Sequence, residues 1–359
     1  MSQSKKRNLG LSLAILALLG VLPGVPTGAD DSAKVRVGLG FMGNPSHAAY
    51  PILRSRRMEL GPPMVRTGQR PIGRANDGTM TYGREADEEG FELLVTVFWD
   101  QRHDDDGPFN EAARTRLLAT CAGVAQYADV IQTGNEWPGF GLLDPEDELW
   151  QNVECAKAAR RANPEIKVAS PGMMTSTALT LALQFGHINS WRDFRGRVRT
   201  SSGLSEKTAR TRDFYERLYA ALDWDLYDLH IYHSPENILP ARRAFREITG
   251  APTSRILHSE FGVGPIPLKK QGDERVREPC RNNGPNLPFY DTSYPERFKT
   301  ALDAIRKDGG GTVLLFGLIQ DGTGRYFKKR KAVFACHGLI DEDRATIPGV
   351  WDVAVNSNR

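Results

Sequence analysis

The chain has 359 residues, of which 47 are Lys or Arg and 44 are Asp or Glu, giving a formal net charge of +3. Lys5, Lys6 and Arg7 account for this excess, because the first 29 residues contain no acid and the remainder balances at 44 basic against 44 acidic residues. A near-neutral chain lacks the basic surface of a nucleic-acid-binding or lipid-binding protein, so we expect a neutral substrate and neither of those partners.

The N-terminal segment has the three parts of an export signal. Basic residues precede the apolar run LGLSLAILALLGVLPG, and small residues at 27–29 follow it. We therefore predict a signal peptide over 1–29 and a secreted protein, extracellular or periplasmic, whose mature chain begins near Asp30. The alternative is an uncleaved anchor, but the apolar run is shorter than the roughly 20 residues that a spanning helix needs. After cleavage we expect no membrane contact, and a monomer.

Short apolar runs alternate with longer helical stretches along the rest of the chain. Eight such runs are candidate strands, at 35–41, 64–68, 91–99, 128–134, 166–170, 226–232, 255–262 and 312–319. Strands separated by helices form parallel sheets with both faces covered, which explains the continuous apolar runs. Eight repeats in one domain-sized chain favour a single (β/α)8 barrel over residues 30–359.

The helices between these strands carry clear start signals. Asn110 can cap a helix that runs to Val124, and Asp144, followed by Pro145, can cap a helix that ends before Asn163. Two segments are longer than the connections of a minimal barrel: residues 173–212 follow the fifth strand, and residues 264–295 follow the seventh. We interpret both as long loops on the face where barrel enzymes hold their active sites.

Four cysteines remain in the predicted mature chain, and four allow three pairings. Cys121 and Cys155 fall in successive predicted helices, whereas Cys280 and Cys336 fall in late loops. The pairing favoured is Cys121 with Cys155 and Cys280 with Cys336, and the alternative is unpaired buried thiols. No Cys or His spacing matches a metal site, so none is predicted.

Two carboxylates stand where predicted strands end. The fourth strand ends in GNEWPG with Glu136, and the seventh ends in HSEFG with Glu260. Either residue alone could simply cap the next helix. A closed barrel, however, brings the carboxyl ends of both strands to one cavity. Two carboxyl groups facing one cavity are what hydrolysis of a glycosidic bond requires.

The Asn-Glu pair after strand four, the Glu-Phe-Gly of strand seven and the His-x-Tyr of strand six resemble clan A glycoside hydrolases, which include cellulase, mannanase and β-xylosidase types. The resemblance implies that Glu136 is the acid/base, that Asn135 holds the sugar 2-hydroxyl and that Glu260 is the nucleophile of a retaining mechanism. It implies a neutral oligosaccharide or polysaccharide as substrate and no cofactor.

Further residues are candidates for holding substrate or orienting the glutamates. His230 and Tyr232 lie on one face of the sixth strand, where Tyr232 could donate to Glu260; the alternative is a hydrogen-bonded core pair. Arg66 matches an arginine that many clan members aim at the nucleophile, and the alternative is a surface ion pair. Trp137 and Trp99 adjoin strand ends and could stack on a sugar ring, or pack in loops.

The sequence also departs from the clan pattern. No Trp ends the eighth strand, where Phe316 and Gln320 are the nearest candidates, and Trp137 follows the Asn-Glu pair where Pro is common. Because of these departures, the resemblance does not identify the residue that forms the floor of the subsite for the reacting sugar. It also does not identify the subgroup.

Three other interpretations compete. The sequence GLGFMG at 38–43, with Glu59 downstream, satisfies the dinucleotide fingerprint of a nicotinamide-dependent oxidoreductase, although Asn44-Pro45 follow where a helix should begin. A barrel that binds carbohydrate without cleaving it is another alternative. The acidic run at 103–106 could bind a cation, but a solvated turn is favoured.

Overall fold

The computed structural model describes residues 33–40, 59, 64–69, 90–99, 108–137, 143–193, 197–203, 206–232, 235–262, 294–315 and 349–358. Several predictions concern residues outside these ranges: the signal peptide 1–29, the acidic run 103–106, nearly all of the loop 264–295, the Cys280–Cys336 pair, and Phe316 and Gln320. Residues 41–45, which include the last glycine of the dinucleotide fingerprint, also lie outside them.

All eight predicted strands are present. They are β1 (Val35–Leu39), β2 (Met64–Gln69), β3 (Glu92–Val97), β4 (Val130–Thr133), β5 (Lys167–Ala169), β9 (Tyr227–His230), β10 (Ile256–Phe261) and β11 (Gly311–Leu315). A short ninth strand, β6 (Met173–Met174), pairs with the end of β9. The nine strands form one sheet in the order β5-β4-β3-β2-β1-β11-β10-β9-β6, and every pairing is parallel.

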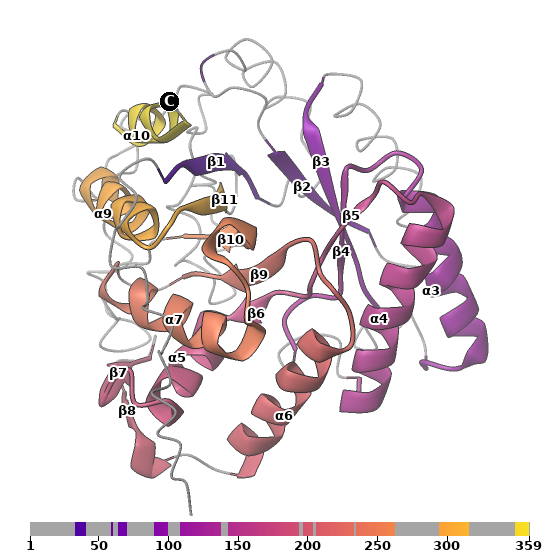
Figure 1. Ribbon diagram of the computed structural model, residues 1–359, viewed down its shortest axis with the longest axis horizontal. Helices are drawn as coiled ribbons and strands as arrows, with labels where there is room; N and C mark the ends of the chain where they lie inside the picture. The colour runs from indigo at the N-terminus through magenta and orange to yellow at the C-terminus, as the bar shows by residue number, and fades with distance from the viewer. Residues whose placement is uncertain are drawn as a thin grey trace, which may run out of the picture.

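The sheet closes on itself (Figure 1). The first and last strands, β1 and β11, pair along their whole length, from Val35 with Gly311 to Leu39 with Leu315. On the other side, Ala169 at the end of β5 forms a parallel bridge with Leu226, the residue before β9. The predicted (β/α)8 barrel is therefore confirmed.

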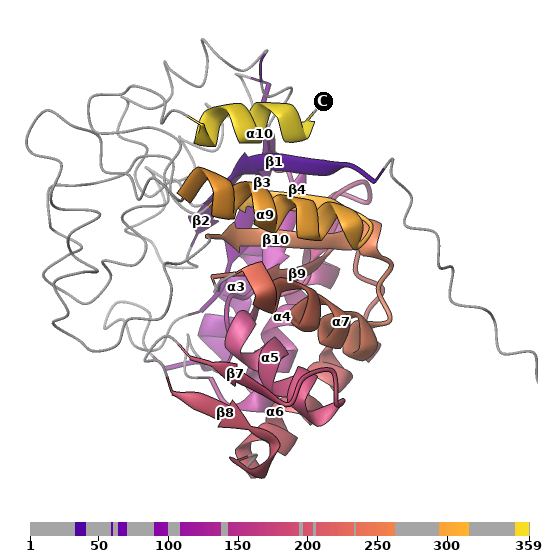
Figure 2. The same cartoon turned by 90° about the vertical axis from the view of Figure 1, so that its left-hand side faces the viewer.

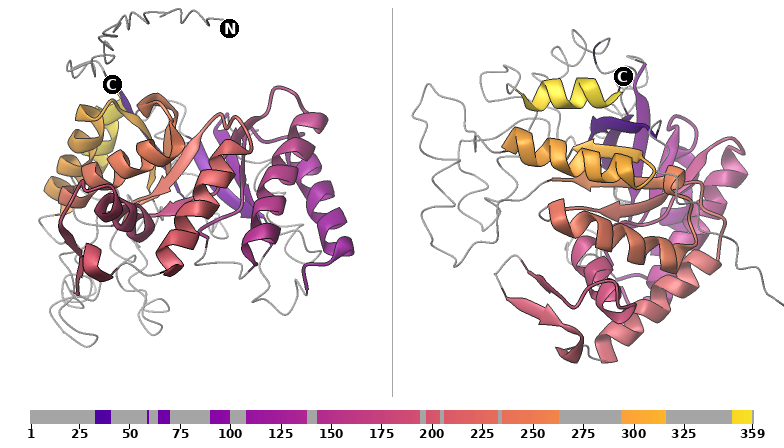
Figure 3. Two further views of the ribbon diagram at one scale, coloured as in Figure 1. Left: turned by 60° about the horizontal axis from the view of Figure 1, so that its bottom comes forward. Right: turned by 60° about the vertical axis from the view of Figure 1, so that its left-hand side comes forward.

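Helices cover the outside of the barrel. They are α3 (Glu111–Val124), α4 (Pro145–Ala162), α5 (Thr175–Gln184), α6 (Glu206–Ala220), α7 (Ile238–Thr249), α9 (Tyr294–Lys307) and α10 (Val350–Asn358), with 3-10 turns at Ser201–Gly203, Pro235–Asn237 and Thr253–Arg255. Figure 2 shows α7, α9 and α10 running alongside the strands, and Figure 3 shows α3 and α4 on the opposite side of the barrel. Among the described residues, no helix is long and apolar enough to span a membrane.

The predicted helix signals are confirmed. The side chain of Asn110 accepts a hydrogen bond from the Ala113 backbone N–H, and Asp144 caps α4, whose first residue is Pro145. Helices α3 and α4 are joined by a disulfide between Cys121 and Cys155, the pairing that the sequence favours.

The segment after β5 is long, as expected, but it is not an irregular loop. It contains β6, helix α5 and a hairpin of β7 (Ser190–Arg192) and β8 (Val198–Thr200). Helix α5 buries Ala178, Leu179 and Ala182, and it begins without a side-chain cap. Burial of this apolar face stabilises the helix. Because no side chain caps its first turn, the sequence contains no signal that marks where the helix starts.

Candidate active site

The barrel interior is built in layers. Apolar residues that point inward form one buried cluster across it: Met64, Leu94, Val130, Ala169, Leu257 and Leu314. Side chains in a strand return to the same face every second residue. The next inward position on each strand therefore lies one step closer to the carboxyl ends of the strands.

That next layer is polar. It contains Arg66, Thr96, Gln132, Asp228 and Ser259, all buried. Arg66 Nε donates to Thr96 Oγ1 at 2.8 Å and to Gln132 Oε1 at 3.0 Å, and Gln132 Nε2 donates to Asp228. Asp228 also accepts from the backbone and the hydroxyl of Ser259. Because each member is hydrogen-bonded, this layer forms a satisfied polar floor beneath the two glutamates.

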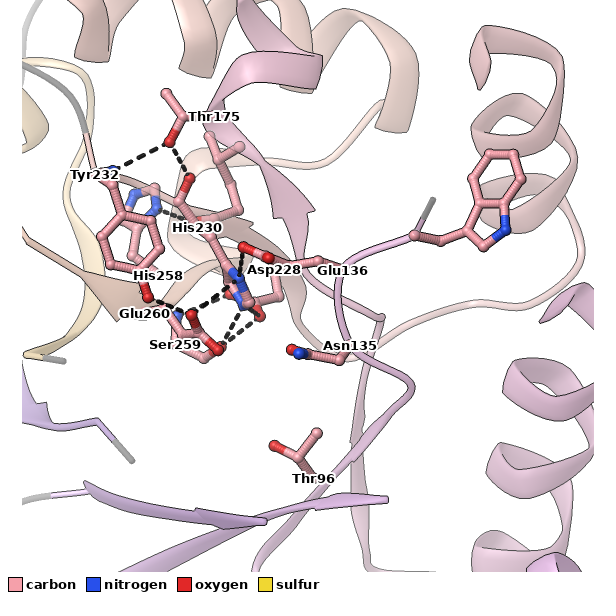
Figure 4. Close-up of polar contacts among 12 residues, drawn as sticks. Thr96, Asn135, Glu136, Thr175, Asp228, His230, Tyr232, His258, Ser259 and Glu260 are labelled. Atoms are coloured by element: carbon pink, nitrogen blue, oxygen red, sulfur yellow. Dashed lines mark hydrogen bonds and ion pairs between the residues drawn. The ribbon is translucent and has the colours of Figure 1, made fainter. Parts of the chain in front are cut away.

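Glu136 stands just beyond the end of β4. The chain leaves the strand at Gly134, whose φ of +75° is a left-handed conformation that favours glycine. Glu136 is buried, and its Oε1 lies 2.8 Å from Nδ1 of His230 on β9 (Figure 4). Burial raises the pKa of Glu136, and the neighbouring Glu260 raises it further, although His230 and Arg66 oppose the shift.

Glu260 reaches the same cavity from β10 through an irregularity in the strand. Between His258 and Phe261, β10 has one residue more than its partner β11. Such a bulge lets adjacent residues face the same side. Ser259 Oγ lies 3.0 Å from Nε2 of His230, and Glu260 Oε2 lies 3.5 Å from its Nδ1.

Three groups favour the ionised form of Glu260. Arg66 Nη1 donates to Oε1 at 2.6 Å, and the hydroxyl of Tyr232 donates to Oε2. Burial alone would raise the pKa of Glu260, but the charges of His230 and Arg66 and the hydrogen bonds from Arg66 and Tyr232 outweigh it and hold this pKa below its ordinary value. The two glutamates therefore have pKa values shifted in opposite directions.

His230 lies between these carboxylates. Its Nε2 is 3.0 Å from Asp228 Oδ2, and its Nδ1 faces both Glu136 and Glu260. Burial would lower the pKa of His230, but the charges of Glu260 and Asp228 raise it to about 10. At neutral pH the ring is then a cation that donates from both nitrogens.

Arg66 and Asn135 complete the site. Arg66 is buried rather than part of a surface ion pair, and its Nη2 donates to Asn135 Oδ1 at 3.2 Å. Asn135 is partly exposed and lies beside Glu136 in the same segment (Figure 4). The structure thus brings together six of the predicted site residues: Arg66, Asn135, Glu136, His230, Tyr232 and Glu260.

Neither tryptophan ring is free to contact a sugar in this cavity. Trp99 has no exposed surface, and its ring packs against Phe109, with the centroids 5.8 Å apart. Of the two alternatives for Trp99, stacking on a sugar ring is therefore wrong, because the side chain packs in the core. Trp137 is 7% exposed and its ring lies on Phe214 of α6, with the centroids 4.1 Å apart, so it too serves packing.

The dinucleotide interpretation loses its structural basis. Gly38 lies inside β1, where a Cβ atom would come within 2.5 Å of the Met64 carbonyl oxygen and 2.7 Å of Leu314, so packing explains the glycine. The carboxylate of Glu59 accepts from Trp351 Nε1 at 2.8 Å. The sheet is a closed barrel and not the open sheet that the fingerprint requires.

One group of side chains in the described part of the chain has the spacing of metal ligands. Glu136, His230 and Glu260 each offer an atom within 4.8 Å of the other two. Arg66 is bound to Glu260 in this group, and His230 is itself a cation at neutral pH. A metal ion would have to displace both positive charges, so the geometry favours an acid–base site.

The chain matches no family model and no curated protein by sequence. Its structure is similar to a GH10 endoxylanase from a sugarcane soil metagenome (10% identity, 89% of this chain and 97% of that chain, TM-score 0.57). It is also similar to a GH53 catalytic domain of Ignisphaera aggregans (13% identity, 94% and 98%, TM-score 0.52). The chain shares the (β/α)8 barrel fold with these glycoside hydrolases.

A third structure with this fold is an exo-β-1,4-mannosidase of Opitutaceae bacterium strain TAV5, at 13% identity and a TM-score of 0.55. The similarity covers 90% of this chain, which spans 59% of the mannosidase. At such low identities these similarities establish the (β/α)8 barrel fold, and the activity has to be argued from the site.

Proposed function

We propose that this protein is a retaining glycoside hydrolase that cleaves an O-glycosidic bond in a neutral oligosaccharide or polysaccharide. The observation that carries the proposal is the pair Glu136 and Glu260 at the mouth of one barrel, with oxygens within 4.8 Å of each other and pKa values shifted in opposite directions. Unlike environments for two carboxyl groups provide one acid and one nucleophile.

The spacing of the carboxyl groups supports retention of configuration. Retaining glycosidases hold the two groups about 5–5.5 Å apart, whereas inverting enzymes leave about 6.5–9.5 Å for a water molecule. In this site one oxygen of Glu136 and one of Glu260 lie within 4.8 Å of each other, and we take this closeness as support for retention. We therefore assign direct attack by a carboxylate in preference to attack by water.

The first step forms a covalent intermediate. An oxygen of ionised Glu260 attacks the anomeric carbon while protonated Glu136 transfers its proton to the glycosidic oxygen, so the sugar–oxygen bond breaks and an alcohol leaves. Since His230 occupies Oε1 of Glu136, Oε2 is the atom that we assign to carry the proton. We assign Asn135, beside it, to bind the sugar 2-hydroxyl.

The second step releases the sugar. Glu136, now ionised, takes a proton from water, the water oxygen attacks the anomeric carbon, and Glu260 leaves as a carboxylate. Arg66 and Tyr232, which donate to Glu260, stabilise it both before attack and after release. No cofactor takes part in either step of this scheme.

Substitution of the two glutamates tests the assignment. Glu260→Gln should abolish turnover of every substrate, whereas Glu136→Gln should retain formation of the intermediate from aryl glycosides with good leaving groups. A panel of aryl glycosides and polysaccharides supplies the substrate, and proton NMR of the first-formed anomer reports the stereochemistry. Normal activity in both variants would reject the site, and an inverted product would reject the double displacement.

We further propose that the protein is exported and acts as a monomer, with residues 1–29 removed. The apolar leader and the Cys121–Cys155 disulfide support this proposal, because disulfides persist in oxidising compartments. N-terminal sequencing of the protein from culture fluid or periplasm should begin near Asp30. Protein found only in the cytoplasm, with Met1 or Ser2 at its N-terminus, would contradict it.

A further inference from the structure

The segment that carries Glu136 is held from outside the barrel by helix α6. The hydroxyl of Tyr215 donates to the backbone carbonyl of Trp137 at 2.7 Å. The ring of Trp137 lies on Phe214 at an interplanar angle of 31°. Phe214 and Tyr215 are adjacent on α6 and both are buried, so the residue after Glu136 is fixed through its backbone and its side chain together.

The other end of the segment is fixed at Gly134. Its backbone N–H donates to the Val97 carbonyl at 2.7 Å, and a side chain at this position would collide with Asn152 of α4. Glu136 therefore lies in a short span of chain between two fixed points. One of these points belongs to the barrel and α4, and the other belongs to α6.

Glu260 is held mainly by residues outside this span, although Arg66 also donates to Asn135 within it. It is held by Arg66 of β2 and by Tyr232 after β9, and its own strand is paired with β9 and β11. A change at the α6 contact should therefore displace Glu136 and leave Glu260 in place.

We infer that Tyr215 is a positioning residue for the acid/base, which sets the place of the Glu136 carboxyl group relative to the leaving oxygen through its hydrogen bond to Trp137. The inference rests on the proposed glycosidase function. General acid catalysis needs the donor oxygen within hydrogen-bond reach of the leaving oxygen, and a misplacement of about 1 Å can cost on the order of 100-fold in rate.

The chemistry of Tyr215 suits this role. Burial, together with the charges of Glu136, Glu148 and Asp228, holds the pKa of its hydroxyl well above the ordinary value. The hydroxyl therefore keeps its proton and remains a donor to the Trp137 carbonyl through the working range of the enzyme.

The test is Tyr215→Phe, with Tyr219→Phe as the matched control. Tyr219 lies one turn further along α6, is buried and stacks on Tyr215 with the ring centroids 5.8 Å apart. In the part of the chain that the structure describes, its hydroxyl makes no hydrogen bond to the segment 134–137. Each variant removes one buried hydroxyl from the same helix, so a general loosening of α6 affects both.

The measurement is kcat/KM on a series of aryl glycosides whose leaving groups differ in pKa. Tyr215→Phe should lose about tenfold or more with poor leaving groups, which need the acid, and little with dinitrophenyl glycosides, which do not. Tyr219→Phe should show no such dependence on the leaving group. A uniform loss in Tyr215→Phe, no loss, or the same leaving-group dependence in both variants would overturn the inference.

Glu136→Gln, measured alongside, separates a failure of the inference about Tyr215 from a failure of the proposed glycosidase function. If this variant shows the strong leaving-group dependence of a missing acid and Tyr215→Phe does not, the inference fails while the proposed function stands. If Glu136→Gln hydrolyses poor leaving groups as fast as the wild type, both fail.

Discussion

At the scale of single residues, the two glutamates differ in how many donors they receive. Glu260 has Arg66, Tyr232 and His230 around it, whereas Glu136 receives a hydrogen bond from His230 and loses hydration by burial. Donors to the ionised form lower a pKa, and burial raises it. The difference between the proposed acid and the proposed nucleophile is thus set by the neighbours, since both residues are glutamate.

Tyr232→Phe should shift one limb of the pH profile of kcat/KM. The hydroxyl stabilises ionised Glu260, so its removal raises the pKa of this carboxylate and makes it protonate at higher pH. The acid limb should therefore move upward by about one pH unit, given the strength of a hydrogen bond to a charged group. The alkaline limb, set by Glu136, should stay in place. An acid limb that does not move would contradict this account of Glu260.

The sequence pattern was sufficient to find the residues that carry charge at strand ends, but not those that support them. Glu136, Glu260, His230 and Tyr232 stand in recognisable motifs. Asp228 and Ser259 have no motif of their own. Their importance comes from facing inward one layer above the apolar cluster, and that requires knowing the face of each strand. The bulge that turns Glu260 inward likewise depends on pairing with β11, which no local pattern records.

At the scale of elements, helix α4 carries a buried acid beneath the loop that follows β4. Glu148 accepts hydrogen bonds from the amides of Gln151 at 2.8 Å and Asn152 at 3.0 Å. Gln151 also accepts from the backbone N–H of Trp99, and Asn152 packs under Gly134. The pKa of Glu148 is raised to about 7 by burial, which the two amides offset only in part.

Glu148→Gln should therefore change how stability depends on pH. In the wild type, burial of the neutral carboxyl is favourable below the ordinary pKa of 4.5, and this contribution is lost as pH rises through about 7, where the group must ionise inside the protein. The variant cannot ionise. Relative to the wild type, its free energy of unfolding should rise by about 3 kcal/mol over that pH interval. Urea unfolding at a series of pH values measures the difference, and parallel curves would contradict the assignment.

Helices with a cap residue could be located from sequence, and those without one could not. Asn110 and Asp144 marked the starts of α3 and α4, and both caps are made in the structure. Helix α5 begins at Thr175, after an N-cap residue, Met174, whose side chain makes no capping hydrogen bond, so a loop is predicted there from the sequence. Its stability comes from packing against α7 and the barrel, which only the tertiary structure supplies.

At the scale of the whole molecule, the closed sheet could be predicted because eight alternating repeats leave few other arrangements. The extra strand β6 could not be predicted, since two residues carry no periodicity.

Replacing Cys121 and Cys155 together by Ser tests how far the whole fold depends on the disulfide. The bond joins residues 34 apart, a loop for which removal costs about 3–4 kcal/mol of unfolding free energy. Urea unfolding measures the free energy of unfolding of the oxidised wild type, the reduced wild type and the double variant. This free energy should be equal in the last two and lower than in the oxidised wild type. Equal stability of all three would show that packing between α3 and α4 suffices.

In the proposed export of the protein, the position of this disulfide along the chain also implies an order of events. A chain that crosses a membrane from its N-terminus delivers both cysteines once residue 155 has emerged, long before Gly311 can meet Val35 to close the ring. Oxidation can then join α3 to α4 on either side of β4 while half of the barrel is still absent. The covalent bond would serve as an early scaffold for assembly, in addition to bracing the finished barrel.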